Sequence, residues 1–171
     1  MKASILRSIK EVQEIKYEWA SLYSVSNNQN PFLTWEWIRL WLDLEGDDLK
    51  IRVVVIKDKG SIVCIAPFCI KNKELLFLSD SLFSDYMDIL VLKNSAEIFE
   101  LIVDTIIQSN EWDRSDLLTI PESSGMLQHY QPVFSKKTIF SVAQICHINP
   151  FIPLVGDFDD FILKRSKIFF K

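Results

Sequence analysis

The residues in this chain whose types best suit chemistry are two acids and a phenol, Asp85, Tyr86 and Asp88. Two carboxylates and a phenol at the entrance to a strand could orient a polar acceptor or move a proton. The alternative is structural: Asp85 would cap a turn, and Tyr86 would pack with its hydroxyl at the surface. If residues 85–90 are extended, Asp85 and Asp88 point to opposite faces, which argues against a paired-acid role and favours the structural interpretation. The sequence assigns no catalytic base.

Three tryptophans close together form a second candidate, a platform on which a sugar ring could stack. Trp37 and Trp41 are four residues apart and share a helix face with Leu40 and Leu44, so we expect both in the core. Trp35 lies off that stripe. It is therefore the tryptophan that we expect to contact a ligand or another domain.

Histidine and cysteine give neither a metal site nor a nucleophile. His129 and His147 have no acidic neighbour at metal-ligand spacing. Cys146 is adjacent to His147, and adjacent strand residues face opposite sides, which keeps a thiol and its base apart. Cys64, Cys69 and Cys146 form no CxxC pair and lie in apolar runs, so we expect buried free thiols.

Composition excludes several classes of protein. The chain has 171 residues, of which 49% are hydrophobic, and this suits a folded domain with one core. A net charge of −4 gives no positive field for nucleic acid. No apolar run approaches the roughly 18 residues that a membrane span needs, and the first ten residues lack the apolar centre of a signal peptide. A cytoplasmic protein is the expectation.

Apolar spacing predicts two helices in the first fifty residues. Ser8 and Glu11 form a capping box before the first. Its apolar face holds Val12, Ile15, Trp19, Leu22 and Tyr23. Residues 24–30 form a turn, and Thr34 caps the second helix, which carries the Trp37 stripe and ends near residue 46.

From residue 51 the pattern is that of strands. Residues 51–56 and 61–70 are β-branched runs joined by a hairpin turn over 57–60, and Pro67 marks an edge or a bulge. Further strands are predicted at 74–78, 85–92, 117–120 and 140–148. Helices are predicted after Asn94, over 123–130, and from Asp157, with Phe158, Phe161 and Ile162 on one face. This order predicts an α/β (α+β) fold with a mixed central sheet flanked by helices on both faces. The predicted domain covers residues 1–156, and 157–171 begin a further helix.

These segments, in this order, resemble the N-terminal half of the CelD-like, cellulose-biosynthesis type acetyltransferases of the GNAT superfamily, relatives of the Fem-type transferases with two GNAT-like halves. The matching pieces are residues 31–34 leading into the tryptophan helix, 62–68 with Ala66-Pro67, Ser84-Asp85-Tyr86 with Asp88, and 117–122 with Pro121. The resemblance covers nearly the whole chain. It implies a GNAT-like sheet and transfer of an acyl group from acetyl-CoA to an amine or hydroxyl acceptor, as in polysaccharide or cell-envelope metabolism. In the family, a second half follows the last helix and holds the acetyl-CoA.

The residues themselves bear on that cofactor. A GNAT-type site needs several backbone N–H groups converging on the pyrophosphate at a helix N-terminus, and glycines normally permit that approach. The four glycines are Gly46, Gly60, Gly125 and Gly156, and the most suitable strand-to-helix junction, residues 92–96, contains none. We therefore expect this chain to bind no acetyl-CoA alone and to be inactive alone. It would help to shape the acceptor cleft, with Asp85, Tyr86, Asp88 and Trp35 as the acceptor-binding residues.

The last eight residues are basic and then apolar. The basic residues are Lys164, Arg165, Lys167 and Lys171, which a helix C-terminus favours without any partner. Ile168, Phe169 and Phe170 would be exposed at a free terminus, so we expect them at a seam with the second GNAT half or in a homo-oligomer. The alternative function is a non-catalytic interaction module that docks a partner or a second copy through this helix.

Overall fold

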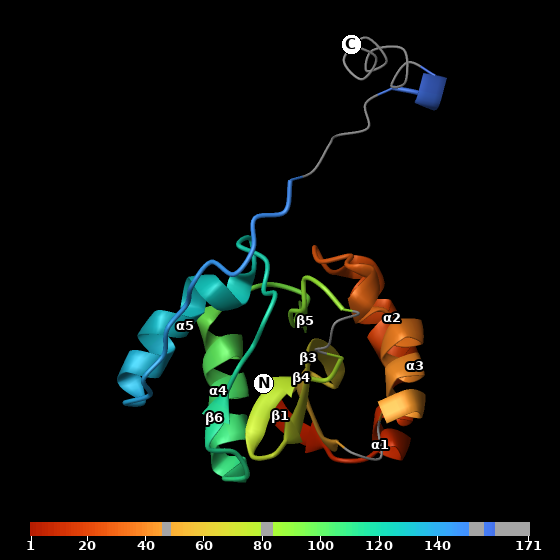
Figure 1. Cartoon of the computed structure of the whole chain (residues 1–171). Coiled ribbons are helices and arrows are strands. Elements are labelled where there is room, and N and C mark those ends of the chain that lie inside the picture. Colours follow the sequence, from red (N-terminus) through yellow and green to blue (C-terminus); the bar gives the residue numbers. More distant parts are fainter. Residues whose placement is uncertain (46–48, 80–83, 151–155, 160–171) are drawn as a thin grey trace.

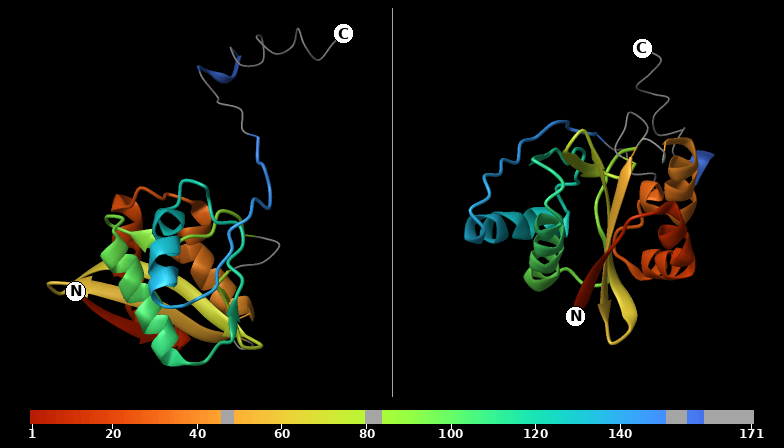
Figure 2. Two further views of the ribbon diagram at one scale, coloured as in Figure 1. Left: turned by 90° about the vertical axis from the view of Figure 1, so that its left-hand side faces the viewer. Right: turned by 90° about the horizontal axis from the view of Figure 1, so that it is seen from below.

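The computed structural model describes residues 1–45, 49–79, 84–150 and 156–159. A mixed sheet lies at the centre of the molecule, with α1, α2 and α3 on one face and α4 and α5 on the other (Figure 1, Figure 2). The predicted α+β class, a mixed sheet flanked by helices on both faces, is confirmed. None of the helices in the described part of the chain is long and apolar enough to cross a membrane.

The six strands are β1 (Lys2–Leu6), β2 (Lys50–Asp58), β3 (Ser61–Lys71), β4 (Glu74–Phe77), β5 (Leu90–Val91) and β6 (Arg114–Ser115). Their order in the sheet is β1-β2-β3-β4-β6, and β5 pairs with β3 beyond the end of β4. Every pairing is antiparallel except that between β4 and β6. Residues 51–56 and 64–70 are fully buried because helices cover both faces of the sheet, as their continuous hydrophobicity predicts.

The β2–β3 hairpin forms where the sequence predicts it. Its two-residue turn is Lys59 and Gly60, which have φ of 47° and 91°, the left-handed values that a tight hairpin turn requires. Pro67 lies in the central strand β3, so the expected edge position is wrong. It separates the residues of β3 that pair with β4 from those that pair with β5, where the ladder is interrupted. A residue without an N–H fits that interruption.

The helices are α1 (Ile9–Glu14), α2 (Lys16–Val25), α3 (Trp35–Glu45), α4 (Ala96–Ser109) and α5 (Gly125–Lys136), with a 3-10 turn η1 (Pro31–Leu33) before α3. The Ser8–Glu11 capping box is confirmed. The cap of α4 is Ser95, whose hydroxyl accepts from the Ile98 N–H, and not Asn94. Ser124 caps α5 in the same way, accepting from the Met126 N–H.

Helix α3 is rotated relative to the predicted face. Ile38 and Leu42 are buried, whereas Leu40 and Leu44 are 53% and 73% exposed. Trp35, expected off the core, packs against it and lies edge-on to Trp19 with the ring centroids 6.2 Å apart. The helix is apolar on more than one side, so two faces have the same spacing, and only the packing against α2 distinguishes them.

Two predicted strands are absent, and a third, over 85–92, is reduced to the two residues of β5, Leu90–Val91. Residues 117–120 form no strand, and the short β6 lies just before them at Arg114–Ser115. Residues 140–148 also form no strand and lie exposed, because they have no partner strand in this structure (Figure 1). Cys146 is therefore exposed rather than buried, whereas Cys64 and Cys69 are buried as expected.

Of the helix predicted from Asp157, the structure describes only its start, with Phe158 and Asp159 helical and Phe158 75% exposed. Phe161 and Ile162 lie outside the described residues. So do the basic cluster at 164–171 and the apolar Ile168, Phe169 and Phe170.

Candidate functional site

The fold joins two segments that lie fifty residues apart in the sequence, 28–37 and 84–88. The Asn30 side chain donates from Nδ2 to the carbonyl oxygens of Asp85 at 3.1 Å and Tyr86 at 2.5 Å. The Trp37 indole Nε1 donates to the Ser84 hydroxyl at 2.9 Å. These bonds fix the loop before α3 to the segment that carries the candidate acids.

Asp88 is the buried centre of this junction, with 5% of its surface exposed. Its carboxylate accepts from the Ile89 N–H at 2.8 Å, the Ser124 hydroxyl at 2.8 Å and the Asn28 Nδ2 at 3.2 Å. Burial raises the pKa of the Asp88 carboxyl above its ordinary value, and the three hydrogen bonds oppose that rise. Asp88 thus holds together the α2–η1 loop, its own segment and the start of α5.

Asp85 and Tyr86 lie on the outside of the same segment. Both are exposed, and Tyr86, 42% exposed, has a φ of 56°, a left-handed conformation that is uncommon for an aromatic residue. After the turn at Tyr86 the chain enters the interior, and Met87 and Asp88 are both buried. Asp85 is thus exposed and Asp88 is buried, and they are separated by the turn at Tyr86 rather than by the alternation of the extended strand that the sequence suggested.

Trp37, not Trp35, is the tryptophan at this site. It is partly buried, bonded to Ser84, and edge-on to Phe32 with the ring centroids 5.0 Å apart. Sequence reasoning placed Trp37 in the core and missed Asn28, Asn30 and Ser124. The asparagines of the turn before Pro31 were a signal, since Asn side chains commonly bond to nearby backbone, but nothing indicated which distant segment they would contact.

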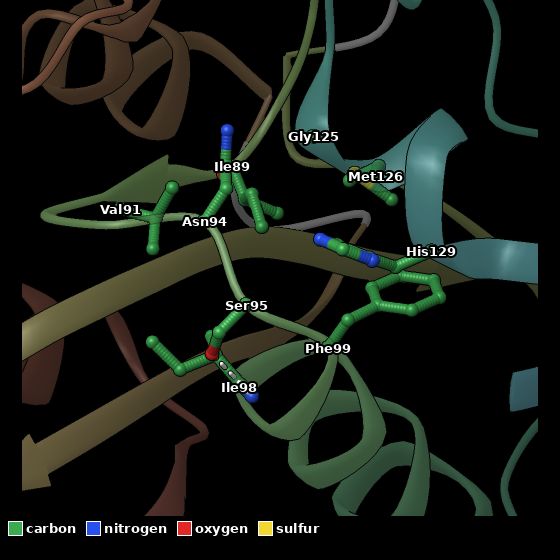
Figure 3. A pocket seen from close by; sticks show the side chains of 9 residues that line it. All are labelled: Ile89, Val91, Asn94, Ser95, Ile98, Phe99, Gly125, Met126 and His129. Atoms are coloured by element: carbon green, nitrogen blue, oxygen red, sulfur yellow. Dashed lines mark hydrogen bonds between the residues drawn. The ribbon is translucent and has the colours of Figure 1, made fainter.

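The start of α4 does not fit the pyrophosphate of acetyl-CoA. A cavity of about 10 Å³, roughly the space of one water, lies between the starts of α4 and α5 (Figure 3). Ser95 caps the helix and uses the Ile98 N–H, and the Asn94 side chain lies against Gly125, where an added Cβ would come within 2.2 Å of it. Side chains thus occupy the space that a phosphate would need. We therefore derive no step through this cofactor on the described residues.

A second polar cluster joins β1 and β2 to the end of α4. Arg52, 7% exposed, donates from Nε to Glu111 at 2.6 Å, and Arg7 donates to the same carboxylate at 2.9 Å. The hydrogen bond from Arg52 lowers the pKa of the Glu111 carboxyl to about 2. This arrangement neutralises a buried guanidinium, which is a structural role.

A hollow of about 510 Å³ lies beside that cluster, lined in part by Lys50, Lys71 and Lys73. None of its lining residues belongs to segments 28–37 or 84–88. The described residues hold no group of three acidic, histidine or cysteine side chains placed to bind a metal ion.

Comparisons with protein-family models, curated proteins and solved structures give no match to this chain.

Proposed function

We propose that this chain is the acceptor-binding, N-terminal GNAT-like part of an acyltransferase that transfers an acetyl group to an amine or hydroxyl. The observation that carries the proposal is the hydrogen-bonded junction of segments 28–37 and 84–88. The two motifs on which the resemblance rests most come together in space, although fifty residues separate them in the chain.

Within this proposal the residues have different roles. Tyr86 and Asp85 are exposed and offer a phenol and a carboxylate, which are groups that bind amines and sugar hydroxyls. They follow Ser84 in the chain, and the Ser84 hydroxyl accepts from the Trp37 indole. Asp88 is buried, so its role would be to hold segment 84–88 in place through its hydrogen bonds rather than to bind the acceptor. Trp35, which packs in the core, is removed from the acceptor-binding set.

Because the start of α4 does not fit a pyrophosphate, we assign the binding of acetyl-CoA to the second GNAT half that the resemblance implies. Bound to that half, acetyl-CoA would supply the acetyl group. Residues 85–88 would orient the acceptor for direct attack. Cys64 and Cys146 are not joined in a disulfide, which suits the reducing cytoplasm that we propose as the setting.

Amide resonances of the isotope-labelled chain test the proposal, with glucosamine, which carries both an amine and hydroxyls, as the probe. We expect saturable shifts at residues 84–88 and around Trp37 in the millimolar range. Tyr86→Ala should abolish them, and Tyr17→Ala, which removes an exposed tyrosine of α2, should not. Shifts that map elsewhere, or that survive Tyr86→Ala, would refute the assignment of this site.

A second candidate function is again a non-catalytic interaction module, but one that docks through residues 140–148 instead of the C-terminal helix, which lies outside the described residues. Phe140 and Ile148 are 92% and 86% exposed in the described part of the chain, more than a folded domain usually leaves open to water. This segment is open to a partner whether or not the chain is part of an acyltransferase.

A further inference from the structure

Residues 140–148 have the composition of a strand without the structure of one. Positions 138–148 contain no glycine, proline, lysine, arginine or acid, a combination typical of segments that pair readily as β-strands. On an extended chain Phe140, Val142, Cys146 and Ile148 share one face. Val142 and Ile145 are 70% and 85% exposed, so neither face is covered in this structure.

The sheet offers one long unpaired edge within the described residues. Strand β1 (Lys2–Leu6) stands at the end of the strand order and pairs only with β2. Its Ala3 and Ile5 pack against the core, while Lys2 and Ser4 are exposed. The outer edges of β5 and β6 extend over only two residues each. An added strand of about five residues therefore fits β1 best.

The segment does not reach β1 of its own chain. Ile139 is held to the end of α5 by a hydrogen bond from its N–H to the Phe134 carbonyl at 3.0 Å. From there residues 140–150 run away from the N-terminus of β1 in each view (Figure 1, Figure 2). The free segment and the free edge of one molecule are thus placed for a neighbour rather than for each other.

We propose that residues 140–148 of one chain add as a strand to the β1 edge of a second copy, and that the exchange is reciprocal. Each copy supplies one segment and one edge, so the contact closes into a two-fold dimer. Strand addition satisfies the backbone N–H and C=O groups of both partners, and the apolar residues of the segment become covered. Self-pairing of two segments is the weaker arrangement, because an isolated two-stranded ribbon is marginally stable in water.

The native cysteines report the contact. Cys146 lies in the segment and is exposed, whereas Cys64 and Cys69 are buried. We expect light scattering to show a dimer whose fraction rises with concentration. Cys146 should react with Ellman's reagent at least about tenfold more slowly in the dimer than in dilute solution. A monomer at every concentration, with a fast-reacting thiol, would overturn the proposal.

Two pairs of variants locate the contact. Val142→Glu should return the chain to a monomer whose helical circular dichroism signal is unchanged, since residue 142 lies outside the helices. The matched control Val25→Glu, at a 58% exposed position of α2, should leave the dimer intact. A dimer that persists in Val142→Glu contradicts the assignment of the segment.

Disulfide trapping identifies the edge. Ser4→Cys should form a cross-linked dimer with native Cys146 under mild oxidation, and the exposed Ser21→Cys of α2 should not. Equal trapping of the two variants, or a Cys146–Cys146 disulfide as the main product of Ser4→Cys, would refute pairing with β1.

Discussion

Asp88 shows how one buried side chain determines the shape of the candidate site. Its two carboxylate oxygens receive three donors from three separate segments, and one of these donors, Ser124, also caps α5. Removal of the carboxylate would leave those donors without an acceptor in a buried place. Neutralisation of the carboxylate would leave most of the hydrogen bonds intact. The two changes therefore have different consequences.

We expect Asp88→Ala to lower the free energy of unfolding by about 2–4 kcal/mol, the loss typical of orphaned buried donors. Asp88→Asn should cost far less, because the Asn oxygen still accepts from Ser124 and Ile89. The folded-state pKa of Asp88 is raised above its ordinary 3.8, so its contribution to stability is fully present below that pH and declines as the pH rises through the raised value. Urea unfolding between about pH 3 and pH 8 should show a weaker decline in stability in Asp88→Asn than in the natural chain, because the variant has no carboxyl at this position. Equal losses for both variants at neutral pH would mean that the charge itself is required.

Glu111 gives the opposite dependence on pH. Its pKa is lowered from 4.5 to about 2 in the folded chain, so its contribution is present above pH 4.5 and is lost as the pH falls toward 2. Glu111→Gln should lower the free energy of unfolding at neutral pH by about 2 kcal/mol, because buried Arg52 loses its counter-charge. The exposed pair Arg39–Asp43 is the control, and Asp43→Asn should change stability by only about 0.5 kcal/mol or less. Similar losses in both variants would count against a special role for the Arg52 cluster.

At the scale of helices and strands, the sequence predicts those elements that depend on residues a few positions apart. The β2–β3 hairpin, the Ser8 capping box and the amphipathic α4 were predicted because their apolar spacing and turn residues act within a few positions. The predicted face of α3 was wrong because its two candidate faces have the same spacing. The short β6 was missed because Arg114–Ser115 carries no strand pattern and pairs only through its backbone with β4.

The candidate site was predictable in part. The sequence indicated residues 84–88 and argued against a paired role for Asp85 and Asp88. It could not indicate Asn28, Asn30, Trp37 or Ser124 as their partners, because each of those contacts spans 36 or more residues. Only the packed sheet and helices bring them within hydrogen-bonding distance.

The caps of α4 and α5 permit a matched comparison at the same scale. Ser95→Ala removes a cap alone and should cost about 1 kcal/mol. Ser124→Ala removes both a cap and the hydrogen bond to Asp88, so it should cost roughly 2–3 kcal/mol. The difference in thermal or urea unfolding between the two variants measures the bond to Asp88. If the two losses are equal, Ser124 acts as a helix cap and no more.

At the scale of the whole molecule, an exposed segment follows α5, which ends at Lys136 and is the last element that packs on the sheet among the described residues. In dilute solution, where the chain is monomeric, we expect brief chymotrypsin digestion, followed by mass spectrometry, to cut first after Phe140, which is 92% exposed. The remaining N-terminal fragment should keep its folded circular dichroism signal, since residues 142–150 are exposed in the single chain. Early cuts between β1 and α5 would contradict this division.

The parallel pairing of β4 with β6 also bears on the order in which the sheet folds. Strands β2, β3 and β4 are joined by turns of two residues, at Lys59–Gly60 and Asn72–Lys73. In contrast, Glu74 pairs with Arg114, which follows α4 in the chain. Contacts that close short loops form early in folding, and those across long loops form late. The antiparallel meander is therefore the expected nucleus, and the edge at β6 the last part of the sheet to acquire protection in a pulse-labelling experiment.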